Sequence, residues 1–243
     1  RDVERSRGLG DVYKRQVCAF AERHGIRKIV FTSSIAPYGA AEELKEETTL
    51  PMPNTPYGIS KLVAEKIHQT WQAGGEGRQL TIVRPGVVFG RGENGNFTRL
   101  YWGIRGHKFM YPGRKDTIKA CIYVKELVRF MLYRLEHHDS GVELYNCCYE
   151  PAYTIEHIVE SMKRVTNMKV KVPFMPGWLI MTAAGIAGAL GSPMGICPAR
   201  VRKLQISTNI CGKKLSASGY RFHYTFEEAL ADWYKDNGNL YLQ

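Results

Sequence analysis

Residues 28–34 read KIVFTSS, a short run of apolar and β-branched residues that ends in two serines. A continuous run of this kind is typical of a strand that is buried on both faces of a parallel sheet. Two further runs, 80–84 and 142–148, have the same character. The segments between them contain helical patterns, and strands that alternate with helices predict an α/β fold with parallel pairing.

The clearest predicted helix is 56–72, which starts with proline and places Ile59, Val63 and Ile67 at helical spacing. The end of a helix is expected before Gly25, and an extended segment at 120–123. Further helices are expected at 99–106, 124–137 and 155–166. The second half, from about Asn94, mixes helix with irregular Gly/Pro segments. It is expected to lie over the strand ends, where doubly wound folds bind ligands.

Composition limits the class of protein. The chain has 243 residues, 44% of them hydrophobic and 23% charged, which excludes a mainly disordered or low-complexity chain. Lys and Arg outnumber Asp and Glu by 34 to 23, for a formal net charge of +11. A basic chain favours an anionic partner. No arginine-rich arm or RNA-recognition signature is present, so we expect a phosphate-bearing small molecule and no nucleic acid.

The six cysteines form no C-x-x-C pair. We therefore expect no metal site, and a reduced, cytoplasmic protein. Residues 172–199 contain no charged residue, but their continuous apolar part, 178–190, has only 13 residues and contains glycines. A membrane-spanning helix needs about 20. We expect a buried or lid helix and no integral membrane segment; contact with a membrane surface or another subunit is the alternative.

Residues 1–16 show no helical or strand period, and residues 6–16 resemble one translated frame of a sequencing adapter. We expect them to be a non-native leader joined to a truncated gene. An ordinary flexible tail is the alternative interpretation.

One pair of residues suggests chemistry. Tyr57 and Lys61 lie four positions apart on the predicted helix 56–72 and so share a face. Ser34 ends a predicted strand, and active groups gather at the carboxyl ends of parallel strands. Tyrosine titrates near pH 10, so it needs a nearby cation to act as a base at neutral pH. A second pair of this spacing, Tyr111 and Lys115, has Pro and Gly between its members, and no helix is expected to align it.

Three ordered motifs carry a family resemblance: FTSSIAPYG at 31–39, PYGISK at 56–61 and VRPGVVFG at 83–90. Together they resemble the extended short-chain dehydrogenase/reductase family, in particular its NAD-dependent epimerases/dehydratases of nucleotide sugars. The resemblance extends from Val17 to about Trp233. It implies a partial doubly wound, Rossmann-like sheet that lacks its first βαβ units, with a small α/β substrate lobe. It assigns 17–93 and 118–150 to the dinucleotide-binding domain, and 94–117 and 151–243 mainly to the substrate lobe.

The resemblance also implies roles for individual residues. Ser34 matches the catalytic serine, Tyr57 the general acid/base, and Lys61 its partner, which also binds the cofactor. The further cofactor contacts that it implies are Thr32, Ser33, Arg84, Pro85, Val87 and Val88. The substrate contacts that it implies are Ala36, Asn94, Asn96, Phe97 and Arg200.

Two departures from the family pattern matter. The glycine-rich dinucleotide fingerprint is absent, and we expect it upstream of Val17, so the chain alone should be inactive. NAD is the expected cofactor, with NADP left open, because the discriminating residue would also lie upstream. Ile35 and Ala36 occupy the place where sugar 4,6-dehydratases have an Asp-Glu pair. This departure disfavours dehydration and favours epimerisation or reduction.

We therefore expect an NAD(P)-dependent epimerase of a nucleoside-diphosphate sugar, working by transient hydride transfer with Tyr57 as general acid/base and forming a homodimer at full length. One alternative is a reductase or dehydrogenase of a sterol-like or flavonoid-like substrate, which the apolar 178–190 stretch favours and the arginines at 84, 200 and 202 disfavour. A second alternative is a non-catalytic binding protein of the same fold.

Overall fold

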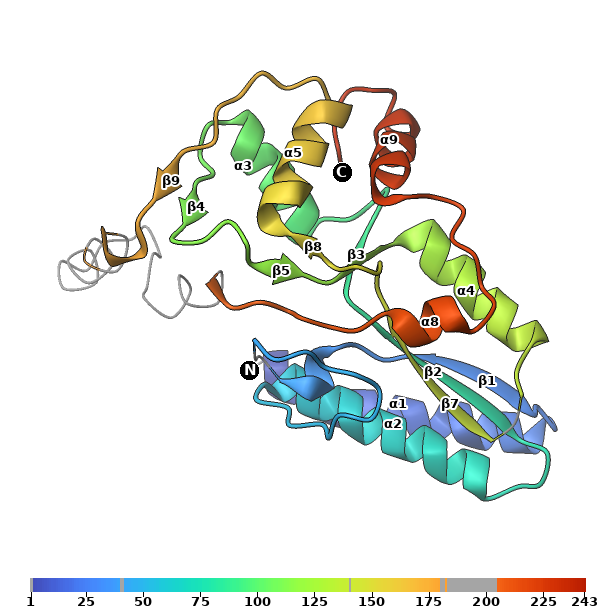
Figure 1. Ribbon diagram of the computed structural model, residues 1–243. Helices are drawn as coiled ribbons and strands as arrows, with labels where there is room; N and C mark the ends of the chain where they lie inside the picture. Colours follow the sequence, from blue (N-terminus) through green and yellow to red (C-terminus); the bar gives the residue numbers. More distant parts are fainter. Residues whose placement is uncertain (1, 40–41, 140, 180–181, 183–204) are drawn as a thin grey trace.

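A computed structural model describes residues 2–39, 42–139, 141–179, 182 and 205–243. Its central sheet has three parallel strands in the order β1 (Lys28–Thr32), β2 (Gln79–Pro85), β7 (Val142–Cys147), as Figure 1 shows. The parallel α/β fold predicted from the sequence is confirmed. The middle strand β2 is buried along nearly its whole length, whereas β1, which pairs with a strand on one side only among the described residues, is half-exposed.

Helices cover both faces of this sheet. Helices α1 (Asp2–Arg23) and α2 (Pro56–Ala73) pack together on one face, and α4 (Val124–Glu136) contacts β1 and β2 from the other (Figure 1). Helix α2 starts where its sequence predicts, because Pro56 takes the first position and the Thr55 hydroxyl accepts a hydrogen bond from the Gly58 amide at 3.1 Å. This cap fixes the first turn of the helix, which carries Tyr57.

Helix α1 runs continuously from Asp2 to Arg23, although residues 1–16 show no helical period in the sequence. That residues 1–16 are a non-native leader stays a prediction. Cys18 and Ala21, near the carboxyl end of α1, pack against Trp71 of α2. Once a turn is formed, adding residues to its amino end needs no new nucleation, and an apolar period is not required there.

The second half of the chain forms an aromatic core around Phe89 and Trp233. Strand β3 (Val87–Phe89) pairs in parallel with β6 (Cys121–Tyr123) beneath helices α3 (Asn96–Arg105), α5 (Ile155–Val165) and α9 (Phe226–Asp236). The shorter elements are η1 (Ala36–Tyr38), β4 (Tyr111–Pro112), β5 (Ile118–Lys119), β8 (Tyr153–Thr154), β9 (Phe174–Met175) and α8 (Lys213–Ala217). Strand β4 pairs with β9, and β5 with β8.

None of the helices in the described part of the chain combines the length and apolar character needed to cross a membrane. Most of the apolar stretch 178–190 lies outside the described residues, as does Arg200. The predicted boundaries between the dinucleotide-binding domain and the substrate lobe remain predictions.

Candidate active site

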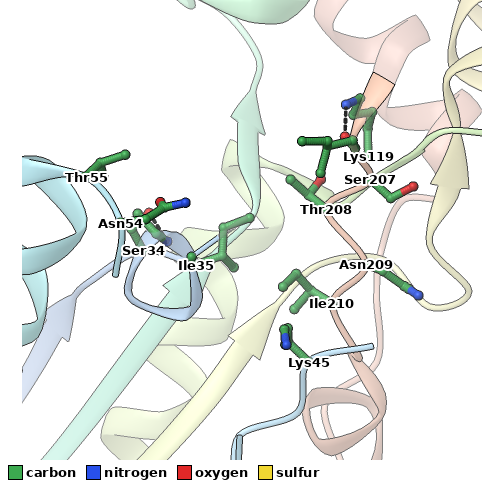
Figure 2. A pocket seen from close by; sticks show the side chains of 13 residues that line it. Ser34, Ile35, Lys45, Asn54, Thr55, Lys119, Ser207, Thr208, Asn209 and Ile210 are labelled. Atoms are coloured by element: carbon green, nitrogen blue, oxygen red, sulfur yellow. Dashed lines mark hydrogen bonds between the residues drawn. The ribbon is translucent and has the colours of Figure 1, made fainter. Parts of the chain in front are cut away.

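A cleft of about 410 Å³ opens beside the carboxyl ends of the parallel strands. One wall comes from the loop after β1, with Ser34 and Ala36, and from Asn54 and Thr55 just before α2. Figure 2 shows the opposite wall, formed by Lys119 and the extended segment that follows Gln205. The residues of that segment that line the cleft are Ile206, Ser207, Thr208, Asn209 and Ile210.

Backbone hydrogen bonds join Lys45, in the loop between η1 and α2, to the wall formed by residues 206–210. The Lys45 amide donates to the carbonyl of Asn209 at 2.9 Å, and the Cys211 amide donates to the carbonyl of Lys45 at 2.9 Å. Lys45 and Ile210 thereby form a parallel bridge, although 165 positions separate them in the sequence. The backbone therefore fixes Lys45 beside Ile210 in the lining of the cleft.

Two lysines line the cleft. Among the described residues of its lining, Lys45 and Lys119 are the charged ones, and two carboxylates adjoin them. The Lys45 ammonium pairs with the exposed Glu43 at 2.9 Å, and Glu42 accepts a hydrogen bond from the Ser207 amide at 2.9 Å. The Lys119 ammonium donates a hydrogen bond to the Ile206 carbonyl at 2.8 Å. Burial lowers the pKa of Lys119, whereas the negative charge of Glu42 raises it. An ammonium group that is shielded from water attracts an anion more strongly than an exposed one. The cleft is therefore suited to a phosphate-bearing ligand.

Ser34 reaches the cleft from the turn that follows β1. Its hydroxyl oxygen accepts a hydrogen bond from the Ala36 amide at 3.1 Å. This bond orients the side chain and leaves the hydroxyl proton available to a ligand. Ala36, a predicted substrate contact, lines the same cleft.

Tyr57 and Lys61 lie on the first turns of α2, at the same end of β1. The Lys61 ammonium is 5.8 Å from the centre of the Tyr57 ring and donates to the Thr32 carbonyl at 3.0 Å. Burial lowers the pKa of Lys61, and the charge of Lys14 lowers it further, while Glu65 raises it. Tyr57 is 56% exposed and is not among the residues that line the cleft.

The second Tyr-x-x-x-Lys pair shows that ring contact alone does not define a site. No helix aligns Tyr111 and Lys115, yet the Lys115 ammonium lies 5.1 Å from the centre of the Tyr111 ring. Tyr111 is buried, and burial together with Glu160 and Glu156 raises its pKa. Lys115 also pairs with Glu156 at 2.9 Å. These two residues therefore form a structural contact, away from the strand ends that carry Ser34.

A buried polar network lies behind the cleft. Arg84 donates from Nε and Nη2 to the two carboxylate oxygens of Glu65, at 2.8 and 2.6 Å. The Ser33 hydroxyl donates to the same carboxylate at 2.5 Å. The guanidinium carbon of Arg84 also lies 4.5 Å from the centre of the Tyr38 ring, and the Tyr38 hydroxyl donates to Asn146 at 2.8 Å. Ser33 and Arg84 thus connect strands to α2.

The remaining predicted site residues are dispersed. Pro85 is buried, and Val87 and Val88 pack partly against the two largest apolar clusters. Asn94 and Asn96 are exposed near the start of α3, where the Asn94 side chain accepts a hydrogen bond from Gln243 at 3.1 Å.

Phe97 is only 4% exposed, because its ring stacks on Phe89 with the centroids 4.7 Å apart. Of the predicted cofactor and substrate contacts outside the catalytic trio that the structure describes, Ala36 alone lines the cleft.

Sequence reasoning missed the cations of the cleft. Lys45 and Lys119 stand in no motif, and each is an ordinary lysine in its local sequence. Their shared surroundings depend on the pairing of Lys45 with Ile210 and of Lys119 with Thr208. Within the part of the chain that the structure describes, no cluster of His, Cys, Asp and Glu could hold a metal ion.

A parallel sheet covered by helices on both faces, with Ser, Tyr and Lys at its carboxyl end, defines the class of Rossmann-like α/β proteins. The sequence profile of the NAD dependent epimerase/dehydratase family matches residues 12–148, and the chain belongs to this family.

Two relatives describe the family further. The chain is 32% identical over 222 residues to the N-acetyl-alpha-D-glucosaminyl-diphospho-ditrans,octacis-undecaprenol 4-epimerase of Escherichia coli O157:H7, a match that covers 89% of this chain and 67% of that protein. It is 25% identical over 167 residues to the UDP-glucose 4-epimerase of Yersinia enterocolitica, covering 60% of this chain and 50% of that protein. The chain therefore matches about half to two thirds of the length of these relatives.

Among solved structures, the fold is similar to that of the UDP-glucuronic acid 4-epimerase from Bacillus cereus in complex with NAD. The TM-score is 0.68 at 17% identity, and the match covers 92% of this chain and 66% of that one. At this identity the likeness concerns the fold alone.

Proposed function

We propose that the protein is an NAD-dependent 4-epimerase of a sugar that is linked to a diphosphate. One observation carries the proposal: Ser34 lines a cationic cleft at the end of β1, where the Lys61 ammonium beside Tyr57 is also anchored. The names of the relatives support it, since the E. coli and Yersinia proteins are both 4-epimerases.

The residues present fit the nicotinamide end of NAD. Lys61, fixed to the Thr32 carbonyl, and the exposed Tyr57 place an ammonium and a phenol at the carboxyl end of a parallel strand, where such cofactors bind. When bound, NAD supplies a reversible acceptor of hydride from the sugar carbon. A glycine-rich turn for the pyrophosphate is not found in this sequence.

The proton chemistry belongs to the chain itself. Tyr57, as phenolate, takes the proton of the sugar 4-hydroxyl and later returns it. The Lys61 ammonium stabilises the phenolate by its charge. The Ser34 hydroxyl, oriented by the Ala36 amide, donates a hydrogen bond to the same sugar oxygen. Inversion at C4 follows when the ketone turns over in the cleft before it is reduced on its other face.

The diphosphate lies against Lys45 and Lys119 in this proposal. They are the cations among the described residues that line the cleft. The exposed Glu43 carboxylate pairs with Lys45 at 2.9 Å, so in this proposal the diphosphate takes the place of Glu43 beside Lys45. The sequence led us to expect a nucleoside as the carrier of the diphosphate. The relatives' names include both UDP and undecaprenol, so the shared chemistry is the sugar diphosphate.

The test uses the full-length protein with NAD and three substrates: UDP-glucose, UDP-N-acetylglucosamine and prenyl-diphospho-N-acetylglucosamine. Proton NMR of the sugar follows inversion at C4, and absorbance at 340 nm follows NADH. Inversion without net NADH formation is expected. Net, stoichiometric consumption of NADH would support the reductase alternative. No turnover of any of the three substrates would contradict the proposal.

We also propose that the full-length protein is a homodimer. The exposed apolar side chains Val17 and Phe20 of α1 and Ile59 and Val63 of α2 lie on two helices that pack together. A second copy of the same surface would remove them from water. Sedimentation equilibrium of wild type and of Ile59→Lys tests this proposal: the dimer is expected to dissociate in the variant, and a monomeric wild type would contradict the proposal.

A further inference from the structure

Three large apolar side chains that lie close together in the sequence, in β9 and the turn after it, are exposed to solvent. Phe174 is 50% exposed, Trp178 70% and Leu179 41%. We refer to these three residues as the β9 surface. Figure 1 shows β9 beside β4 at one end of the molecule, away from the three-stranded sheet. Exposed clusters of this kind usually mark a contact with a partner.

The backbone beneath the β9 surface is held in place. The Tyr111 amide donates to the Pro173 carbonyl at 3.0 Å, and the Gly113 amide donates to the Met175 carbonyl at 2.9 Å. The Leu179 amide donates to the Pro176 carbonyl at 3.0 Å. The side chains are therefore presented to solvent by an ordered segment, although hiding them would be favourable.

Charge identifies the kind of partner. Lys169 and Lys171 are exposed immediately before the β9 surface. In the sequence, residues 172–199 carry no charge, and Arg200, Arg202 and Lys203 follow. Basic residues on both sides of an apolar segment with an exposed tryptophan are typical of proteins that rest on an anionic bilayer.

The β9 surface is also linked to the cleft. The Gln205 side-chain amide donates to the carbonyl of Pro112, in the strand that pairs with β9, at 3.1 Å. The next residue in the chain, Ile206, begins the cleft wall. A partner bound at the β9 surface would therefore lie near the mouth of the cationic cleft.

We propose that the β9 surface docks onto an anionic lipid bilayer, so that the cleft receives a sugar diphosphate whose carrier is a membrane lipid. The choice of carrier rests on the proposed function; the docking itself does not. Phe174, Trp178 and Leu179 enter the interfacial region, and Lys169 and Lys171 contact lipid phosphates.

Vesicle co-sedimentation of the full-length protein tests the docking without cofactor or sugar. Vesicles contain phosphatidylcholine alone or mixed with phosphatidylglycerol. Wild type is expected to bind the mixed vesicles, and the double variant Phe174→Ser, Trp178→Ser to bind at least about tenfold more weakly, because two aromatic side chains no longer leave water. Trp102→Ser is the matched control: Trp102 is 43% exposed on α3, and its loss should leave binding unchanged.

Absence of vesicle binding by wild type, or equal loss in the double variant and the Trp102 control, would overturn the docking. A concentration-dependent dimer that the double variant abolishes, without vesicle binding, would assign the surface to a second copy instead. An inactive protein that still binds vesicles through this surface would overturn the proposed function and leave the docking in place. A protein that epimerises only UDP-sugars, at rates unchanged in the double variant, would overturn the lipid carrier.

Discussion

Glu65 and Arg84 form a two-point ion pair that is closed to solvent, with side-chain exposures of 2% and 3%. Glu65 lies one helical turn after Lys61 on α2, and Arg84 lies near the end of β2. The pair therefore joins the helix that carries Tyr57 to the strand beside β1. Because Ser33 shares the carboxylate, the turn that carries Ser34 is tied to the same pair.

Glu65→Gln should lower the free energy of unfolding by about 3–5 kcal/mol, because it leaves the Arg84 charge buried without its partner. Urea unfolding followed by circular dichroism measures the loss. Glu76→Gln, at an exposed position after α2, is the control and should change stability by no more than about 0.5 kcal/mol. Equal effects of the two substitutions would contradict the importance of the ion pair.

Tyr57→Phe in the full-length protein should lower kcat at least about a hundredfold, the usual scale for loss of a general acid/base. Ligand affinity should change little, because the ring remains. Tyr111→Phe is the matched control, since Tyr111 contacts a lysine at the same spacing but is buried, and its hydroxyl has no hydrogen-bond partner among the described residues. Steady-state epimerase assays compare the two, and similar losses at both positions would refute the role of Tyr57.

Lys119→Met should raise KM for the sugar diphosphate about tenfold or more while kcat changes little, because it removes ground-state binding of the phosphates. The same is expected of Lys45→Met. Lys115→Met, which removes a lysine paired with Glu156 outside the cleft, should leave KM near that of wild type.

The sequence also predicted Arg200 as a substrate contact, so Arg200→Ala belongs in the same series. Calorimetric titration with UDP provides an independent affinity. Unchanged affinity in both the Lys45 and Lys119 variants would remove the diphosphate from this cleft.

Stability should fall below about pH 6.5 through His68. Burial lowers the pKa of His68 from its ordinary value of 6.5, and Lys14 lowers it further, although the hydrogen bond to the Ala64 carbonyl opposes both effects. Between the lowered pKa and 6.5 the unfolded chain binds more protons, so stability present above pH 6.5 is lost as the pH falls. Thermal unfolding between pH 5 and 8 should show this slope in wild type and in His24→Gln, where an exposed histidine is replaced. His68→Leu should flatten it.

The sequence predicts those features that depend on local pattern. Residues 28–34 and 56–72 contain their own signals for strand and helix, and the topology then brings Ser34 and Lys61 to one end of β1. The partners of a side chain are not local. The pairing of Arg84 with the buried Glu65 and the packing of Phe97 on Phe89 depend on residues distant in the sequence and could not be predicted from it. The roles of Arg84 and Phe97 as cofactor and substrate contacts stay predictions.

Helix α1 shows a helix that the apolar pattern of the sequence does not predict. Residues before Val17 lack an apolar period, and the backbone is nevertheless helical, continuous with the packed turn that carries Cys18 and Ala21. Extending an existing helix requires no new nucleation. An apolar period in the sequence indicates which face of a helix is buried. It does not predict exposed turns that extend an existing helix.

The bridge between Lys45 and Ile210 bears on the proposed epimerisation. In that reaction the sugar must present both faces of one carbon to the same hydride acceptor, which requires space for a half-turn. Two backbone hydrogen bonds hold Lys45 against the segment 206–210, so the loop before α2 and this wall of the cleft are held together. The proposed half-turn therefore takes place against a wall that the backbone keeps in position.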